Sequence, residues 1–290
     1  MAKHQVLLDT DIGSDIDDAV CLAYLLVQPD CELLGITTVT GESPRRAEMA
    51  SALCRAAGVN VPVIAGAERP LIAPQRQLLA PQARALSSWA HQAFEKAEPF
   101  LAVDFLRKTI RANPGKVTLL AIGPLTNIGL LFAIDPEIPT LLKNLTLMCG
   151  HFAPQAGGEW NAGGDPHATR IVYQAEVNEH CSVGLDVTQK VVMGAGEVRK
   201  RFRNGLLRLV LDFAEVWFEE RNLITFHDPL AAVTLFDEGV CTFELGTVNV
   251  DISAELAGTT RWKPDPDGGH AIAMQVEPQR FFEHFHAAFR

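Results

Sequence analysis

The chain has 290 residues, of which 48% are hydrophobic, and its formal net charge at pH 7 is −10. This length and apolar content suffice for a large buried core, so we expect a globular protein of enzyme size. A surface with this net charge repels nucleic acid backbones and anionic membranes, which argues against both as main partners and leaves small neutral or cationic ligands open.

Nothing in the sequence predicts export or membrane insertion. The first apolar run, residues 5–8, is too short for the core of a signal peptide, and no stretch approaches the roughly 20 apolar residues of a membrane-spanning helix. The six cysteines are widely spaced and include no Cys-x-x-Cys pair, which favours buried thiols over disulfides or a zinc site. We therefore expect a cytoplasmic protein.

The first part of the chain alternates between strand and helix patterns. Strands are predicted at residues 5–9, 31–39 and 62–66, and helices at residues 17–28 and 43–57, the second ended by Gly58. This order predicts right-handed crossovers between parallel strands. The expected fold class is α/β, with an open, mostly parallel, Rossmann-like sheet and helices on both faces.

The rest of the chain continues this alternation after an irregular segment, residues 68–99, for which we expect a long loop plus a helix that covers the site. Further strands are predicted at residues 117–122, 145–149, 182–187 and 247–252, and further helices at residues 100–112, 206–221 and 278–290, with shorter ones beginning near residues 124 and 166. Phe281, Phe285 and Phe289 recur every four residues and predict a helix face that packs on the core. With no internal repeat and no clear linker, residues 1–290 are expected to form a single domain.

An acidic turn separates the first strand from the first helix. Five carboxylates lie within ten residues, those of Asp9, Asp11, Asp15, Asp17 and Asp18. Such crowding raises the electrostatic energy unless a cation or bound protons offset it, and a hard divalent metal is the simplest offset. The turn also lies at the carboxyl end of a predicted parallel strand, where the ligands of such sheets bind.

Other interpretations of the acidic turn explain less. An EF-hand loop counted from Asp9 needs Gly and Glu where the chain has Ser14 and Val20, and zinc would favour His or Cys ligands. A role at the helix N-terminus explains Asp17 or Asp18 but not the other carboxylates.

Two more polar segments carry possible oxygen ligands. Thr126 follows another predicted strand, and Asp228 lies in His227-Asp228-Pro229. Taken alone, the latter is typical of a helix N-cap, and Glu159-Trp-Asn161 is typical of a polar loop with one packed aromatic residue. Brought together by the fold, these oxygens would suit a hard cation.

In order along nearly the whole chain, these segments resemble the nucleoside hydrolase family of the inosine-uridine preferring type. The resemblance rests on Asp9-Thr-Asp11-Ile-Gly13, Asp17-Asp18-Ala, Ile36-Thr-Thr-Val-Thr-Gly41, Gly123-Pro-Leu-Thr126-Asn127, Glu159-Trp-Asn161, Asp165-Pro166, Gly184-Leu-Asp-Val-Thr188 and His227-Asp228-Pro-Leu-Ala.

The resemblance implies a calcium-dependent enzyme that hydrolyses a ribonucleoside, or a close N-riboside, to ribose and free base, in nucleoside catabolism or salvage, as a homodimer or homotetramer. It implies that Asp11 binds Ca²⁺ and takes a proton from the attacking water. Asp18, Asp228 and the carbonyl of Thr126 would complete the protein's metal ligands. Asp17, Glu159 and Asn161 would bind the ribose hydroxyls, and His227 would protonate the leaving base.

The chain departs from the family pattern at several positions. Glu42 and Ala153 stand where the family usually has Asn, so we expect Glu42 and His151 to substitute for the missing sugar contacts. The acidic turn is two residues longer than the commoner form, and residues 68–91 lack the His-Gly pattern that would indicate a base. These departures also leave open a binding protein that has lost catalysis.

A haloacid-dehalogenase-like phosphatase is the remaining alternative, suggested by Asp-x-Asp after the first strand. That class would have Thr or Val at the position of Gly13.

Overall fold

A computed structural model describes residues 3–153 and 157–290. Its nine-stranded sheet has the order β10-β9-β11-β6-β5-β4-β1-β2-β3. The strands are β1 (His4–Thr10), β2 (Cys31–Thr38), β3 (Val63–Ala65), β4 (Val117–Ala121), β5 (Asn144–Leu147), β6 (His180–Ser182), β9 (Cys241–Val250), β10 (Thr260–Pro264) and β11 (His270–Val276). From β11 to β3 all neighbours are parallel, and only β9 runs antiparallel to both of its neighbours. The predicted open, mostly parallel sheet is confirmed.

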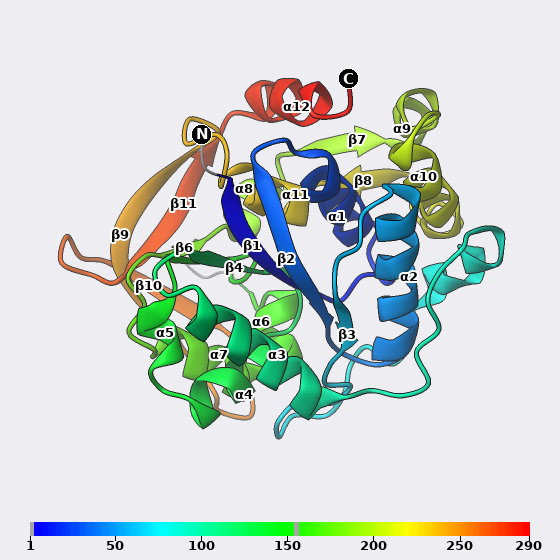
Figure 1. Cartoon of the computed structure of the whole chain (residues 1–290). Helices are drawn as coiled ribbons and strands as arrows, with labels where there is room; N and C mark the ends of the chain where they lie inside the picture. The colour runs from blue at the N-terminus through cyan, green and yellow to red at the C-terminus, as the bar shows by residue number, and fades with distance from the viewer. Residues whose placement is uncertain (1–2, 154–156) are drawn as a thin grey trace.

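Helices cover both faces of the sheet, as predicted (Figure 1). Along β1, Val6 and Leu8 point into one core, whereas Leu7 points into the other, because successive strand side chains alternate between faces. The first core includes residues of α1 (Asp17–Val27), α2 (Ser43–Ala56), α8 (Leu185–Thr188), α9 (Ala195–Arg201), α10 (Leu206–Trp217), α11 (His227–Val233) and α12 (Pro278–Ala287). The second includes residues of α3 (Pro99–Ala112), α4 (Thr126–Ile134), α5 (Ile138–Leu141), α6 (Trp160–Gly164) and α7 (Pro166–Tyr173).

Most of the predicted elements are present within a few residues of their expected ends. Gly58 follows α2 with a φ of 71°, the left-handed conformation that ends many helices. Residues 68–99 form a long irregular segment that contains the 3-10 helix η1 (Pro81–Ser88). Phe281 and Phe285 are fully buried in the first core and Phe289 packs against it, so the predicted docking face of α12 is confirmed.

The strand predicted at residues 182–187 is wrong. β6 ends at Ser182, and Leu185 begins the short helix α8. The carboxylate of Asp186 accepts hydrogen bonds from the backbone N–H groups of Phe152 (2.8 Å) and Ala153 (2.7 Å), which commits this residue to a loop contact. The small antiparallel pair β7 (Val192–Gly194) and β8 (Leu223–Thr225) was not predicted. Within the glycine-rich loop after β5, residues 154–156 lie outside the described residues.

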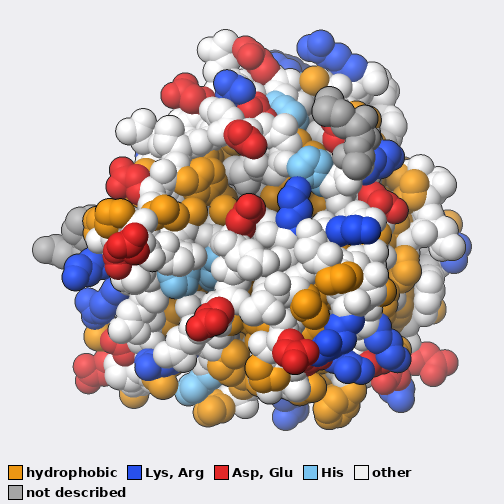
Figure 2. All heavy atoms as spheres, turned by 60° about the vertical axis from the view of Figure 1, so that its left-hand side comes forward, with side chains coloured by type: hydrophobic (Ala, Val, Ile, Leu, Met, Phe, Trp, Pro, Cys, Tyr) orange, Lys and Arg blue, Asp and Glu red, His pale blue; other side chains and the backbone are white. Residues whose placement is uncertain are grey.

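Five of the six cysteines are buried and Cys181 is partly buried, all as free thiols, which confirms the expected buried thiols. Among the described residues no helix is long and apolar enough to cross a bilayer. Figure 2 shows one face of the molecule, on which acidic and basic side chains are interspersed. The marked concentration of like charge lies instead in the interior, beyond the end of β1.

Candidate active site

A cavity of about 620 Å³ opens beyond the carboxyl ends of three neighbouring strands. Asp11 follows β1, Ile122 follows β4 and Met148 follows β5, and all three line this cavity. Its other described lining residues are Ser14, Asp15, Asp17, Asp18, Arg76, Gln77, Leu78, Leu79, Pro81, Glu159, Trp160, Asn161, Leu185, Trp217, Arg221, His227 and Asp228. The fold thus brings the acidic turn together with segments more than 100 residues away, at the place where parallel sheets bind ligands.

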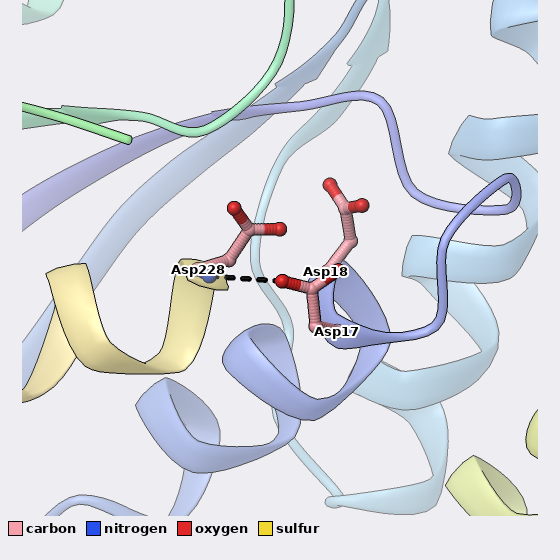
Figure 3. A group of neighbouring side chains, drawn as sticks. All are labelled: Asp17, Asp18 and Asp228. Carbon is pink, nitrogen blue, oxygen red and sulfur yellow. Dashed lines mark hydrogen bonds between the residues drawn. The ribbon is translucent and has the colours of Figure 1, made fainter. Parts of the chain in front are cut away.

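Three aspartates form a tight cluster in this cavity. Carboxylate oxygens of Asp17, Asp18 and Asp228 lie within 4.8 Å of one another. Figure 3 shows them extending from the first turns of α1 and α11 toward a common space, with the backbone N–H of Asp228 donating to Oδ2 of Asp17 at 2.9 Å. Asp11 lines the same cavity without belonging to this closest group.

The electrostatics of the cluster are unfavourable without a counter-charge. Burial, followed by repulsion from neighbouring carboxylates, raises the pKa values of Asp17 and Asp228 well above their ordinary range. Burial also raises the pKa of Asp18 well above that range and the pKa of Asp15 to about 6. Like charges in a low-dielectric site cannot all ionise together unless a cation compensates them.

Arg46 places a buried positive charge near the acidic turn. Its guanidinium binds backbone carbonyls and not the carboxylates of the turn. The guanidinium is fully buried and donates to the carbonyls of Gly41 (2.8 Å), Ile12 (3.1 Å) and Asp11. Among the described residues, no carboxylate lies within 4.0 Å of it as an ion-pair partner. Arg46 therefore fixes the shape of the acidic turn while leaving the cluster free for a cation. Buried oxygen donors without His or Cys suit Ca²⁺ or another hard ion.

Asp9 has a structural role beneath the site. Its Oδ1 accepts hydrogen bonds from Thr37 Oγ1 (2.5 Å) and Asn127 Nδ2 (2.7 Å), and Asn127 also donates to the carbonyl of Thr38 (3.0 Å) and accepts from the backbone of Ala67 (3.0 Å). Burial raises the pKa of Asp9 to about 7. This network joins the ends of β1, β2 and β3 to the start of α4.

Glu159 and Asn161 line the same cavity as the acidic turn. The carboxylate of Glu159 caps α6 by accepting from the backbone N–H groups of Gly150, Asn161 and Ala162, at 2.7 to 3.0 Å. Burial raises the pKa of Glu159, and these hydrogen bonds oppose the shift. The Nδ2 of Asn161 donates to the carbonyls of Ile122 (2.9 Å) and Met148 (3.0 Å), so its Oδ1 is the atom left to accept from a ligand.

His227 stands at the start of α11, next to the aspartate cluster. Its Nδ1 lies 2.7 Å from Thr188 Oγ1, and burial lowers the pKa of the imidazole to about 4. The ring is therefore neutral near pH 7. Leu78, Leu79, Leu185 and Trp217 give the cavity an apolar lining.

Two residues expected in the site, Glu42 and His151, are not among the residues that line this cavity. The Thr126 hydroxyl donates to Asp165 Oδ2 at 2.9 Å, and the expected role of its backbone carbonyl stays a prediction. The carboxylate of Glu42 accepts from the backbone N–H of Ala80 at 2.8 Å. His151 lines a separate cavity of about 900 Å³, 3.8 Å from Asp186.

Several lining residues escaped the sequence prediction, chiefly Ile122, Gln77, Trp160 and Arg221. Ile122 was detectable, since it is the last residue before Gly123 at the end of a predicted strand. Gln77 was not, because the irregular segment that carries it has no periodic pattern.

Comparison with known proteins agrees with this fold and site, which define an α/β protein with a buried carboxylate centre at its strand ends. A family model described as inosine-uridine preferring nucleoside hydrolase matches residues 6–283. The pyrimidine-specific ribonucleoside hydrolase RihB of Escherichia coli is 31% identical over 274 residues, which cover 88% of this chain and 85% of that protein. A probable uridine nucleosidase 2 of Arabidopsis thaliana is 27% identical over 281 residues, covering 89% and 85%.

Solved structures show the same fold. A purine-preferring ribonucleoside hydrolase from Gardnerella vaginalis has a TM-score of 0.84 at 23% identity, covering 98% of this chain and 97% of that one. The chain belongs to the nucleoside hydrolase family. The predicted family and the predicted class of enzyme, a hydrolase of ribonucleoside N-glycosidic bonds, are confirmed, and the phosphatase alternative has no support.

Proposed function

We propose that the protein hydrolyses a ribonucleoside to ribose and free base with a Ca²⁺ ion held by Asp11 and by two members of the aspartate cluster, Asp18 and Asp228. The observation that carries this proposal is the group of buried carboxylates within 4.8 Å of one another, in a cavity that also holds Glu159 and Asn161. The donors are hard oxygens, their burial calls for a positive counter-charge, and the neighbouring polar groups match sugar hydroxyls.

The metal ligands in this proposal are Asp11, Asp18, Asp228 and one backbone carbonyl. That carbonyl is the one of Thr126, as the resemblance implies; the Thr126 hydroxyl donates to Asp165 Oδ2, so it is the backbone oxygen that we assign to the metal. Asp17, whose Oδ2 accepts from the backbone of Asp228, contacts the ribose from the other side of the cluster.

Bound Ca²⁺ would lower the pKa of water and orient the sugar diol. Asp11 takes the proton of the attacking water as general base. Cleavage of the C–N bond develops positive charge on the ribose, which the carboxylates of Asp17 and Glu159 stabilise, and the free Oδ1 of Asn161 accepts a hydrogen bond from a sugar hydroxyl.

His227 acts on the leaving base. In this proposal the Thr188 hydroxyl donates to Nδ1, which places the proton of the neutral ring on Nε2, and this N–H donates a hydrogen bond to the leaving base as the C–N bond breaks. The apolar lining near His227 accommodates the base, and the names of the relatives indicate that both pyrimidine and purine ribosides need testing.

A riboside panel tests the proposal. Purified protein is incubated with uridine, cytidine, inosine, adenosine and guanosine, and free ribose is measured with Ca²⁺, with a chelator, and after Ca²⁺ is restored. We expect chelator-sensitive release that returns with Ca²⁺, and none from Asp11→Ala prepared in parallel as the control for contaminating enzymes. Chelator-insensitive turnover would refute the metal role.

The same panel separates hydrolysis from mere binding. Calcium-dependent binding of a nucleoside in calorimetry, without ribose release over hours, would favour a binding protein that has lost catalysis. The single domain, the cytoplasmic location and the homodimer or homotetramer stay predictions, the last of which light scattering in solution checks.

A further inference from the structure

Residues 77–82, which we call the strap, lie against the acidic turn from outside. The backbone N–H of Gln82 donates to the carbonyl of Gly13 at 3.2 Å, and its side-chain amide donates to the carbonyl of Ser14 at 3.0 Å. The hydroxyl of Ser14 donates to the carbonyl of Leu79 at 3.3 Å. Three hydrogen bonds therefore tie the strap to the backbone and side chain of residues 13–14.

Gln77, at the start of the strap, reaches Asp11 directly. Its Nε2 donates to Asp11 Oδ2 at 2.7 Å and to Ser14 Oγ at 2.5 Å, and its Oε1 accepts from the indole N–H of Trp160. An indole N–H can only donate, so the oxygen of the amide must face Trp160 and its NH₂ must face Asp11. These hydrogen bonds use both polar atoms of the buried side chain and allow its amide group only one orientation.

The backbone of the strap is fixed on its other side by the connection between β2 and α2. The backbone N–H of Gly41 donates to the carbonyl of Gln77 at 3.1 Å, and the N–H of Ala80 donates to the carboxylate of Glu42 at 2.8 Å. Glu42 has a φ of 58°, an uncommon conformation for a residue with a side chain. Glu42 therefore holds the strap through its Oε2.

We infer that Gln77 is a positioning residue, which holds the carboxylate of Asp11 in the orientation that activates water. This inference rests on the proposed function. Among the described residues, Gln77 is the one side chain that donates a hydrogen bond to the Asp11 carboxylate. A general base must lie within hydrogen-bond reach of the proton it takes, and a carboxylate free to rotate would lose that geometry for part of the time. With Oδ2 held by Gln77, Oδ1 is the oxygen left for the reaction.

The test compares two substitutions at Gln77 with one control. Gln77→Met keeps the length of the side chain and removes its hydrogen bonds, and Gln77→Glu keeps an acceptor for Trp160 but removes both N–H donors. Ile72→Ala is the control, because Ile72 belongs to the same irregular segment, is 73% exposed and does not line the active-site cavity. Steady-state kcat and KM are measured on the best riboside of the panel with Ca²⁺ present.

We expect kcat to fall about tenfold to a hundredfold in both Gln77 variants, the loss typical of a hydrogen bond to a charged group, with KM within about threefold of wild type. Hydrogen–deuterium exchange of the chelator-treated protein gives a second readout that needs no turnover. Exchange should rise in residues 77–82 and in the acidic turn for Gln77→Met, and stay unchanged for Ile72→Ala.

The outcomes separate this inference from the proposed function. Ribose release by the wild type together with an unchanged kcat in Gln77→Met would overturn the positioning role alone. Absence of ribose release by the wild type would refute the proposed function, and unchanged exchange in Gln77→Met would then show that Gln77 does not hold the strap against the turn.

Discussion

Replacing Asp18 with Asn removes one buried charge from the aspartate cluster and nearly preserves its shape. Asp18 Oδ1 accepts a hydrogen bond from Thr10 Oγ1 at 2.5 Å, which the amide oxygen of an asparagine can also accept. The side chain is 3% exposed, and burial together with Asp11 raises its pKa well above the ordinary range. In the metal-free protein at pH 7 this charge opposes folding, so Asp18→Asn should stabilise that form.

The size of the effect follows from the separation of the charges. Two unit charges at 4.8 Å, the upper limit of the spacing within the cluster, repel by about 3.5 kcal/mol at an effective dielectric constant of ~20. Protons shared within the cluster remove part of this repulsion, so we expect Asp18→Asn to raise the free energy of unfolding by about 1–3 kcal/mol. The pKa of Asp18 is higher in the folded protein than in the unfolded chain, where it is about 3.9. The ionised carboxylate therefore destabilises the fold increasingly as pH rises above about 3.9, and it has no such effect at lower pH.

Denaturant unfolding at pH 7 measures this difference, once with a chelator and once with Ca²⁺. Calcium at a hundred times its Kd stabilises the wild type by about 2.7 kcal/mol, and it should stabilise Asp18→Asn far less. Asp104→Asn is the matched control, since partly exposed Asp104 pairs with Arg107 and Lys108 and its loss should bring no gain. A metal-free Asp18→Asn protein less stable than wild type, or an equal calcium effect on both proteins, would refute the reasoning.

Three further substitutions test other parts of the site and fold. His227→Ala should slow natural nucleosides by about a hundredfold or more, and slow a nitrophenyl riboside far less; equal losses in kcat/KM on both would remove His227 from the leaving group. Gly123→Ala places a Cβ 2.8 Å from Asp11 Oδ1, so turnover should fall at least about tenfold, whereas Gly196→Ala, with open space around it, should match wild type in the ribose assay. Burial lowers the pKa of His180 well below its ordinary value, so the unfolded chain takes up this proton first and stability falls as pH drops below about 6.5. His180→Phe should therefore reduce the slope of the free energy of unfolding against pH, below about pH 6.5, by up to about 1.4 kcal/mol per pH unit. An unchanged slope in denaturant unfolding would contradict this assignment.

The parallel core of the fold was predictable because its strands and helices are long and strongly patterned. β4 is wholly buried, β1 and β2 are buried over most of their length, and their apolar runs are bounded by Gly, Pro or charged residues that mark the ends. The strand expected at residues 182–187 failed for a local reason. Asp186 alternates with apolar residues, yet its carboxylate accepts hydrogen bonds from two backbone N–H groups 33 and 34 residues earlier, which no local pattern reveals.

The candidate site was predictable where the ligating group is a side chain with its own charge. The acidic turn and Asp228 stand out in the sequence and meet in the structure. A backbone carbonyl carries no residue signature, so the assignment of the Thr126 carbonyl rests on the family resemblance and stays a prediction. Gln77 illustrates a second limit, because its contact with Asp11 depends on how a segment without regular structure crosses the turn.

The acidic turn is held by groups that do not need a bound cation. Arg46 binds the carbonyls of Asp11 and Ile12, and Asn127 binds Asp9 below them. Because these contacts fix the backbone independently of the charged ends of the side chains, loss of the ion changes the protonation of the cluster more than its position. This division between backbone and side chains explains how the acidic turn can carry five carboxylates and still fold. Its backbone hydrogen bonds determine its shape, and a bound cation or protons neutralise the carboxylates at the ends of its side chains.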